Sequence, residues 1–320
     1  MLAGGNHQAF GGGTLRYHLT YGEGFHVYTL TRDQLLFDSQ YIQPRLGPPF
    51  ERTLLYALLE GTVVLRDPEE RLDGPCLLRI TPSLLEGANG RRPRSFFNYG
   101  SPLRLVVLWT SNALVVPHAR LDAGSVEARH LEWPPGLLAA CEDYHQRTER
   151  GEAIQSLRAA AERLVEVCIE AGWLRLSAQG AFDKRWGSLV ERTFEGLLRA
   201  WIHSRNLPSL SDVSGFVGLS RSKLARDIEV FASSIALPGA RWRSTTFDLR
   251  IRQATTFLSA PHAAIGDVAK IVGYGSVEAM ARAFRDAGLP PPIEVRSALR
   301  KLVLSLTEEV GIPAARSPGP

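Results

Sequence analysis

The chain has 320 residues, of which 44% are hydrophobic and 22% charged, and its formal net charge is +4. This length suits roughly two domains with real cores, and the composition excludes a disordered or collagen-like chain. No apolar run reaches the roughly 18 residues of a membrane helix, and the first residues lack the basic and apolar regions of a signal peptide. The three cysteines form no CxxC pair, so we expect a reducing, cytoplasmic setting without membrane contact.

The first 135 residues divide into a glycine-rich lead-in and a β-rich domain. Residues 1–24 contain runs such as Gly11-Gly12-Gly13, which predict a loose, partly ordered segment. Over residues 25–135, short apolar runs alternate with turn signals such as Asp73-Gly74-Pro75. Many short runs with regular turns are typical of a β-sandwich or small barrel, and the stretch from Glu60 to Leu78 resembles hairpins of a cupin-like barrel.

Apolar residues return at helical spacing over residues 136–202. We predict helices over 137–150, 152–171 and 182–204 from residues such as Leu157 and Leu164. One interpretation is that the apolar faces of these helices pack on the barrel. The other is that one face pairs with a second subunit, which would make the segment a dimerisation linker.

A short sequence motif occurs twice in the last third of the chain. Six residues are identical between the copies: Asp212, Val213, Val217, Gly218, Ala225 and Arg226 in the first, and Asp267, Val268, Val272, Gly273, Ala281 and Arg282 in the second. Each copy has the form of a short helix, a glycine-containing turn and a second helix, which is typical of a helix-turn-helix. Two such units in tandem indicate DNA binding.

The second helix of each unit is predicted to begin after a capping serine and to turn one face outward. The outward residues are the candidate DNA contacts: Ser220, Arg221, Ser222, Lys223, Ala225 and Arg226 in the first unit, and Ser276, Glu278, Ala279, Arg282 and Arg285 in the second. An exposed Arg near the start of such a helix suits bidentate bonding to a guanine edge in the major groove. Phosphate contacts are expected from Arg221, Lys223, Arg285 and the helix N-termini.

A longer helix is expected between the units, over residues 241–258, with Ile251, Ala254 and Leu258 facing inward. Such a helix would set the two units on successive major-groove faces, about 34 Å apart. The region is basic, because residues 205–301 hold 14 Lys and Arg against 8 Asp and Glu, whereas the rest of the chain holds 23 against 25. After it, the proline-rich tail over residues 302–320 is expected to fray.

The repeated motif and the residues around it resemble the pattern of a known protein family. The matching positions are Ser220 to Arg226, Arg250-Ile251 with Ala254 and Leu258, Ile265 to Tyr274, Phe284-Arg285, and the closing Gly288, Pro291 and Val295-Arg296. Residues 203–301 resemble the DNA-binding domain of the AraC/XylS family of bacterial transcription regulators. The resemblance implies an α+β chain of two domains, with a cupin-like β-barrel for sensing or dimerisation over 25–135, a helical linker over 136–202 and an all-α tandem helix-turn-helix over 203–301.

The same resemblance implies a sequence-specific transcription activator or repressor. Its implied partners are double-stranded DNA, RNA polymerase, a small-molecule effector and a second copy of the chain, with no cofactor. An effector or partner at the first domain would change the spacing or freedom of the DNA-reading helices. The candidate effector pocket combines aromatic residues with arginines that suit an anionic ligand: Tyr56, Arg79, Tyr99 and Arg104. The alternative is that these aromatic residues are core.

The first unit departs from the family pattern. Asp227 and Glu229 flank Ile228 where an aromatic-Lys pair is usual, and acidic side chains near DNA would repel phosphates. We therefore expect the second unit to be the stronger reader. The same residues motivate an alternative, an interaction protein that antagonises another regulator through residues 137–204 and binds DNA weakly.

Neither enzymatic activity nor a metal centre is expected. The eight histidines show no HxH or HExxH spacing, and no GxSxG, P-loop or strand-associated GxGxxG motif occurs. Cys76 is interpreted as a small core residue rather than a nucleophile.

Overall fold

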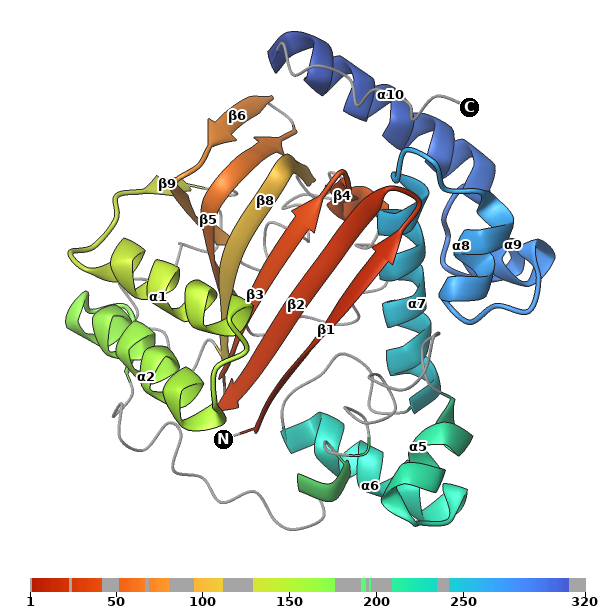
Figure 1. Cartoon of the computed structure of the whole chain (residues 1–320), viewed down its shortest axis with the longest axis horizontal. Coiled ribbons are helices and arrows are strands. Elements are labelled where there is room, and N and C mark those ends of the chain that lie inside the picture. Colours follow the sequence, from red (N-terminus) through yellow and green to blue (C-terminus); the bar gives the residue numbers. More distant parts are fainter. Residues whose placement is uncertain are drawn as a thin grey trace, which may run out of the picture.

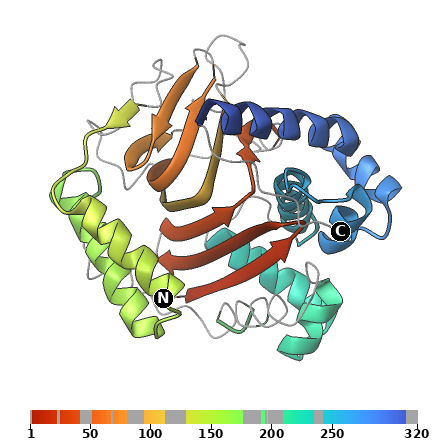
Figure 2. The same cartoon turned by 45° about the horizontal axis from the view of Figure 1, so that its top comes forward.

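The computed structural model describes residues 2–22, 25–41, 52–66, 69–80, 95–111, 129–175, 191–193, 196, 209–234 and 242–310 (Figure 1). A curled antiparallel sheet forms one side of the molecule, and helices surround it (Figures 1 and 2). Within the described ranges, no helix combines the length and apolar character that a membrane span requires.

The sheet has nine strands in the described part of the chain, in the order β1-β2-β3-β8-β5-β7-β9, with β4 added to β8 and β6 to β5. The strands are β1 (Leu2–Phe10), β2 (Gly13–Gly22), β3 (Phe25–Asp33), β4 (Phe37–Asp38), β5 (Arg52–Leu65), β6 (Glu70–Asp73), β7 (Cys76–Ile80), β8 (Phe96–Ser111) and β9 (Arg129–Leu131). A short 3-10 helix, η1 (Ser39–Tyr41), follows β4.

The expected loose lead-in over residues 1–24 is wrong. Its residues form β1 and β2, a hairpin in full register from Leu2 opposite Tyr21 to Phe10 opposite Gly13. Gly11 and Gly12 supply the positive φ angles of 57° and 85° that a tight hairpin turn requires. The glycines therefore mark a turn between two strands, and the β-rich domain begins at residue 2 rather than 25.

The two longest strands, β5 and β8, pair with each other from Arg52 opposite Ser111 to Leu65 opposite Phe96. Their pairing shifts register on either side of Glu60, and Gly61 has a φ of 108° there. Such a bulge bends a strand and increases its twist, which allows the sheet to curl. β6 pairs with the second half of β5, as the hairpin pattern between Glu60 and Leu78 predicted.

The outer face of the sheet is covered by two helices, α1 (Leu137–Glu149) and α2 (Ile154–Glu170). Leu55, Ala57 and Leu59 of β5 belong to one buried cluster with residues of α1 and α2 that include Tyr144 and Leu164. Both helices were predicted within two residues of these bounds. The helix expected over 182–204 lies outside the described residues apart from 191–193 and 196.

The C-terminal part is helical: α5 (Leu210–Val217), α6 (Arg221–Ser234), α7 (Trp242–Leu258), α8 (Ile265–Ile271), α9 (Val277–Asp286) and α10 (Pro292–Val310). The helix expected over 241–258 is confirmed, and its inward residues Ile251, Ala254 and Leu258 are buried. The flexible tail expected over 302–320 is wrong for its first part. Helix α10 continues to Val310, because Leu306 is buried against the sheet and extends the apolar side of the helix.

The sheet and the helices α7 to α10 share one continuous core. Leu15, Leu36 and Tyr99 of the sheet region belong to the same buried cluster as Phe257 of α7 and Phe284 of α9. Polar contacts add to it, because the Leu36 amide donates to Ser259 Oγ at 2.8 Å and the His262 amide donates to the Gly11 carbonyl at 2.9 Å. The expected division at residue 203 therefore does not separate two independent cores.

Candidate nucleic-acid interface

The second repeat forms a pair of helices joined by a tight turn. Gly273 adopts a φ of 82° between α8 and α9, a conformation that favours glycine. Ser276 then caps α9, because its hydroxyl accepts the Ala279 amide at 3.1 Å. The guanidinium of Arg250 on α7 lies 5.8 Å from the ring centre of Tyr274, so α7 supports the turn from behind.

Helix α9 is divided cleanly between an inner and an outer face. Met280 and Phe284 are fully buried and Ala283 nearly so, all within the core shared with the sheet. The predicted contacts Glu278, Arg282 and Arg285 are exposed, and Ala279 is half-buried. The helix therefore presents its two arginines to solvent from a rigid base.

The carboxylate of Glu278 belongs to the capped N-terminus of α9. Hydrogen bonds from its own backbone amide and the Ser276 side chain, together with the nearby charge of Arg282, lower the pKa of Glu278. The side chain is therefore an anion at neutral pH, one turn before Arg282. This negative charge interacts favourably with the dipole at the helix N-terminus, and it partly offsets the positive charge on the outer face.

The first repeat forms a similar pair, α5 and α6. Ser209 and Asp212 make a reciprocal capping box at the start of α5, and Gly218 ends that helix with a φ of 69°. Ser220 caps α6 by accepting the Lys223 amide at 3.3 Å. The predicted contacts Ser220, Arg221, Ser222, Lys223 and Arg226 are exposed, and Ala225 is half-buried.

One expectation about the first pair is wrong. Asp227 does not lie on the outer face, since it is only 7% exposed and its Oδ2 has no hydrogen-bond partner among the described residues. It follows Arg226 by one position, about 100° around the helix, and this rotation turns it inward beside Ile228. Glu229 is exposed as expected, so a single acidic residue of the two remains near the outer face.

The two pairs are attached differently. Val213, Leu224 and Ile228 are buried, yet none of them belongs to the core that the sheet shares with α7 to α10. Figure 1 shows α5 and α6 at the N-terminal end of α7, and α8 and α9 beside its other half. With 17 residues, α7 is about 25 Å long. One helix thus joins a pair fixed to the sheet and a pair outside that core.

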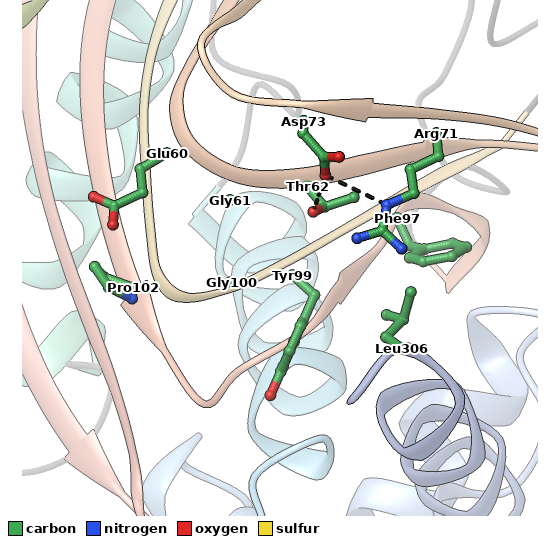
Figure 3. Close-up of a pocket in the computed structure, with 10 residues that line it drawn as sticks. All are labelled: Glu60, Gly61, Thr62, Arg71, Asp73, Phe97, Tyr99, Gly100, Pro102 and Leu306. Carbon is green, nitrogen blue, oxygen red and sulfur yellow. Dashed lines mark hydrogen bonds and ion pairs between the residues drawn. The ribbon is translucent and has the colours of Figure 1, made fainter. Parts of the chain in front are cut away.

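A pocket of about 290 Å³ lies between the sheet and α10 (Figure 3). Three of its polar groups are paired with one another, because Asp73 accepts the Thr62 hydroxyl at 2.6 Å and lies 3.4 Å from Arg71 Nε. Phe97 and Tyr99 line it from β8, and Leu306 lines it from α10. The pocket thus lies where the sheet meets the last helix.

Three of the four residues predicted for an effector pocket have described side chains, and these have different surroundings. Tyr99 lines the pocket just described, whereas Tyr56 lies within the sheet's inner cluster and its hydroxyl accepts Asn98 Nδ2. Arg104 donates to Glu60 at 2.7 Å, so its charge is matched. Arg79 lies in β7, and its side chain is outside the described residues. The alternative that the aromatic residues are core fits Tyr56, which is 4% exposed.

Sequence reasoning missed Arg32, the residue with the least ordinary surroundings in the sheet. It is 2% exposed, and its Nε and Nη1 have no hydrogen-bond partner in the described part of the chain. The signal was present in β3, where Tyr28, Leu30 and Arg32 alternate on one face. An arginine that continues an apolar stripe predicts a buried charge.

Metal ligands and reactive thiols do not gather in the described residues. No group of three His, Cys, Asp or Glu side chains suited to a metal ion occurs among them. Cys76, Cys141 and Cys168 are buried free thiols, and burial raises the pKa of Cys76 to about 11. Cys76 therefore lies in the core as predicted, and its thiol is protonated at neutral pH.

Comparison with known proteins finds structural likenesses of low score. No family model matches the chain, and neither does any curated protein. ToxT from Vibrio cholerae aligns over 85% of this chain and 98% of its own, at 10% identity and a TM-score of 0.32. The AraC-like transcriptional activator CuxR aligns over 70% and 73%, at 11% identity and a TM-score of 0.25.

A further structural likeness covers a smaller share of the chain. The cupin domain of Cnp3 from Schizosaccharomyces pombe covers 34% of this chain and 69% of its own, at 11% identity and a TM-score of 0.23. Scores of this size carry no argument about fold or activity. The function therefore has to be argued from the residues of this chain.

Proposed function

We propose that the chain is a cytoplasmic, sequence-specific DNA-binding regulator of transcription of the AraC/XylS type, with α9 as its principal reading helix. One observation carries the proposal: α9 buries Met280 and Phe284 in the core and presents Arg282 and Arg285 to solvent. A capped helix with a basic outer face on a rigid base meets the requirements of major-groove reading.

Arg282 is the proposed base reader. Its guanidinium matches the O6 and N7 acceptors of guanine, and such a bidentate contact contributes about 1–3 kcal/mol of discrimination. Arg285 lies one turn further along the same exposed face, where it is suited to a phosphate. The capped N-terminus of α9 at Ser276 adds backbone N–H groups toward the DNA backbone.

The first pair is proposed as a second, weaker contact. Arg221, Lys223 and Arg226 are exposed on α6, and burial of Asp227 removes one of the two expected repulsive charges. Helix α7 sets the distance between the pairs. RNA polymerase and a second copy of the chain complete the partners proposed for such a regulator.

The rival function is that of an interaction protein without specific DNA binding. It needs an apolar helical face for the other regulator, and in the described part of 137–204 most large apolar side chains are buried or partly buried, although Ile154 is 45% exposed. Leu157, Leu164 and Val165 of α2 are all buried, the last two in one cluster with Leu137 and Tyr144 of α1. This internal packing favours the DNA reader.

A binding experiment on the full chain separates the two functions. The isolated 203–301 fragment is unsuitable because its helices share a core with the sheet. We expect the full chain to retard DNA from upstream of its own gene far more strongly than random DNA, with affinity falling steeply as salt rises. Equal affinity for both DNAs at moderate salt would exclude a specific reader, and size-exclusion chromatography with a co-purified regulator would then favour the rival.

A further inference from the structure

Helix α9 carries a carboxylate on the face that is proposed to read DNA. Glu278 is the second residue of α9, one turn before Arg282 and two turns before Arg285. All three side chains are exposed, whereas Met280 and Phe284 of the same helix are buried. Residues four and seven positions apart share one face of a helix, so the carboxylate and the two guanidinium groups form one row.

The start of the helix holds this carboxylate in place. Ser276 Oγ accepts the Ala279 amide at 3.1 Å. Hydrogen bonds from its own backbone amide and from the Ser276 side chain lower the pKa of Glu278. An ionised carboxylate has about four acceptor positions, so it can accept a further donor while it keeps these bonds. Glu278 is therefore an anion of restricted orientation that can still accept a hydrogen bond.

The position of Glu278 along the helix favours a base over a phosphate. In helix-turn-helix docking, the N-terminal residues of the reading helix reach the base edges on the floor of the major groove. Phosphates, which repel a carboxylate, line the rim of the groove, whereas exocyclic amino groups on the floor donate hydrogen bonds. The second position of α9 therefore places an acidic side chain where DNA offers donors.

One base suits a carboxylate better than the other three. Guanine presents two acceptors, and thymine presents an acceptor beside a methyl group, so neither offers a donor in the major groove. Adenine has a donor at N6 but an acceptor at the neighbouring N7, which repels the second carboxylate oxygen. Cytosine presents its N4 amino group without a neighbouring acceptor. A carboxylate therefore favours cytosine.

We propose that Glu278 is a specificity-determining residue that accepts a hydrogen bond from cytosine N4, close to the guanine read by Arg282. The inference rests on the proposed function. Four residues of an α-helix rise about 6 Å and one base pair of DNA about 3.4 Å, so the two bases lie within about two base pairs of each other. The same carboxylate weakens binding to sequences without that cytosine, because its charge is then desolvated without a partner.

The first helix pair has a neutral residue at the matching position. Counted from the two capping serines, Ser222 of α6 matches Glu278, and Arg226 matches Arg282. Ser222 is exposed, and its hydroxyl can donate or accept, so it does not discriminate between bases as a carboxylate does. The preference for cytosine is therefore expected from α9 and not from α6.

Selection of binding sites from a pool of random duplex DNA tests this inference with the full chain. The wild type should select a motif that contains a guanine and, within about two base pairs of it, a cytosine. Glu278→Gln should keep the guanine and select adenine in place of the cytosine, because a glutamine amide bonds adenine N6 and N7 bidentately. Glu294→Gln is the matched control, since it removes the same charge from an exposed site in the first turn of α10. It should select the wild-type motif.

A second measurement uses the wild-type protein alone and does not depend on the folding of a variant. Replacing the selected cytosine by thymine exchanges the N4 amino group for an O4 acceptor, and it should weaken binding about 10-fold or more at constant salt. The inference is overturned if Glu278→Gln selects the same motif as the wild type, or if the thymine replacement changes affinity by less than about twofold at every selected cytosine. The selected motif would then still support the proposed function. A wild-type chain that selects no motif overturns both.

Discussion

The two helix pairs have the same sequence motif but different structural surroundings. The inner residues of α9, Met280 and Phe284, belong to the core of the sheet, whereas Leu224 and Ile228 of α6 lie outside that core. The second pair is therefore packed into the main core, whereas the first pair is packed outside it, with Gly196 lying against Val213 and Val217 of α5. A tandem repeat can thus place one helix pair in the main core and the other outside it, and we expect the pair outside the core to open more readily.

The largest expected effect separates the pairs by stability. Phe284→Ala should lower the free energy of unfolding of the whole sheet-and-helix core by about 3–5 kcal/mol, because it empties a fully buried site. Leu224→Ala, at an equally buried position in the first pair, should melt residues 209–234 and spare the sheet. Urea unfolding followed by hydrogen exchange distinguishes these outcomes. Loss of protection in the sheet for Leu224→Ala would show that both pairs belong to one cooperative unit.

A middle-sized effect is expected at Asp227. Asp227→Asn should stabilise the first pair by about 1–2 kcal/mol, because it removes a buried charge with an unpartnered oxygen. The control Glu229→Gln, at an exposed position, should stay within about 0.5 kcal/mol of the wild type. Local exchange rates in α6 provide the measurement. A destabilised Asp227→Asn variant would show that the carboxylate makes a stabilising interaction.

The smallest effect compares the two serine caps. Ser276→Ala and Ser220→Ala should each cost about 1 kcal/mol, since both remove a bond to a free helix amide. Ser276→Ala should appear as a small shift in global unfolding, and Ser220→Ala only in the exchange of α6 amides. A global shift of equal size for both variants would remove the distinction between the pairs. Ser→Thr variants, which keep the hydroxyl, serve as controls.

The sequence predicted the helices better than the sheet. The bounds of α1, α2 and α7 follow from apolar spacing, and those of α6 and α9 from capping serines after glycine turns, because these signals are local. The hairpin of β1 and β2 was missed because its glycines resemble those of a flexible segment unless the pairing partner is known. The extension of α10 was missed because burial of Leu306 depends on the distant sheet.

The residues of the candidate sites also differ in whether a local sequence pattern could predict their exposure. The exposed residues of α9 were predicted because helix periodicity alone separates them from Met280 and Phe284. Asp227 was misplaced because an acidic residue was assumed to face solvent, although its helical position turns it inward. Arg32 was missed for a similar reason, since it lies opposite the buried Leu15 of β2 and the buried Leu103 of the distant strand β8.

The central claim, that the pair fixed to the sheet is the principal reader, is tested most directly by comparing Arg282→Ala with Arg226→Ala. Both arginines are exposed and occupy matching positions in the repeat. In quantitative gel shifts of the full chain on its own upstream DNA, Arg282→Ala should lose about 1–3 kcal/mol of specific binding and keep its affinity for random DNA. Arg226→Ala should lose less. The reverse ranking would contradict the account and assign base reading to the first pair.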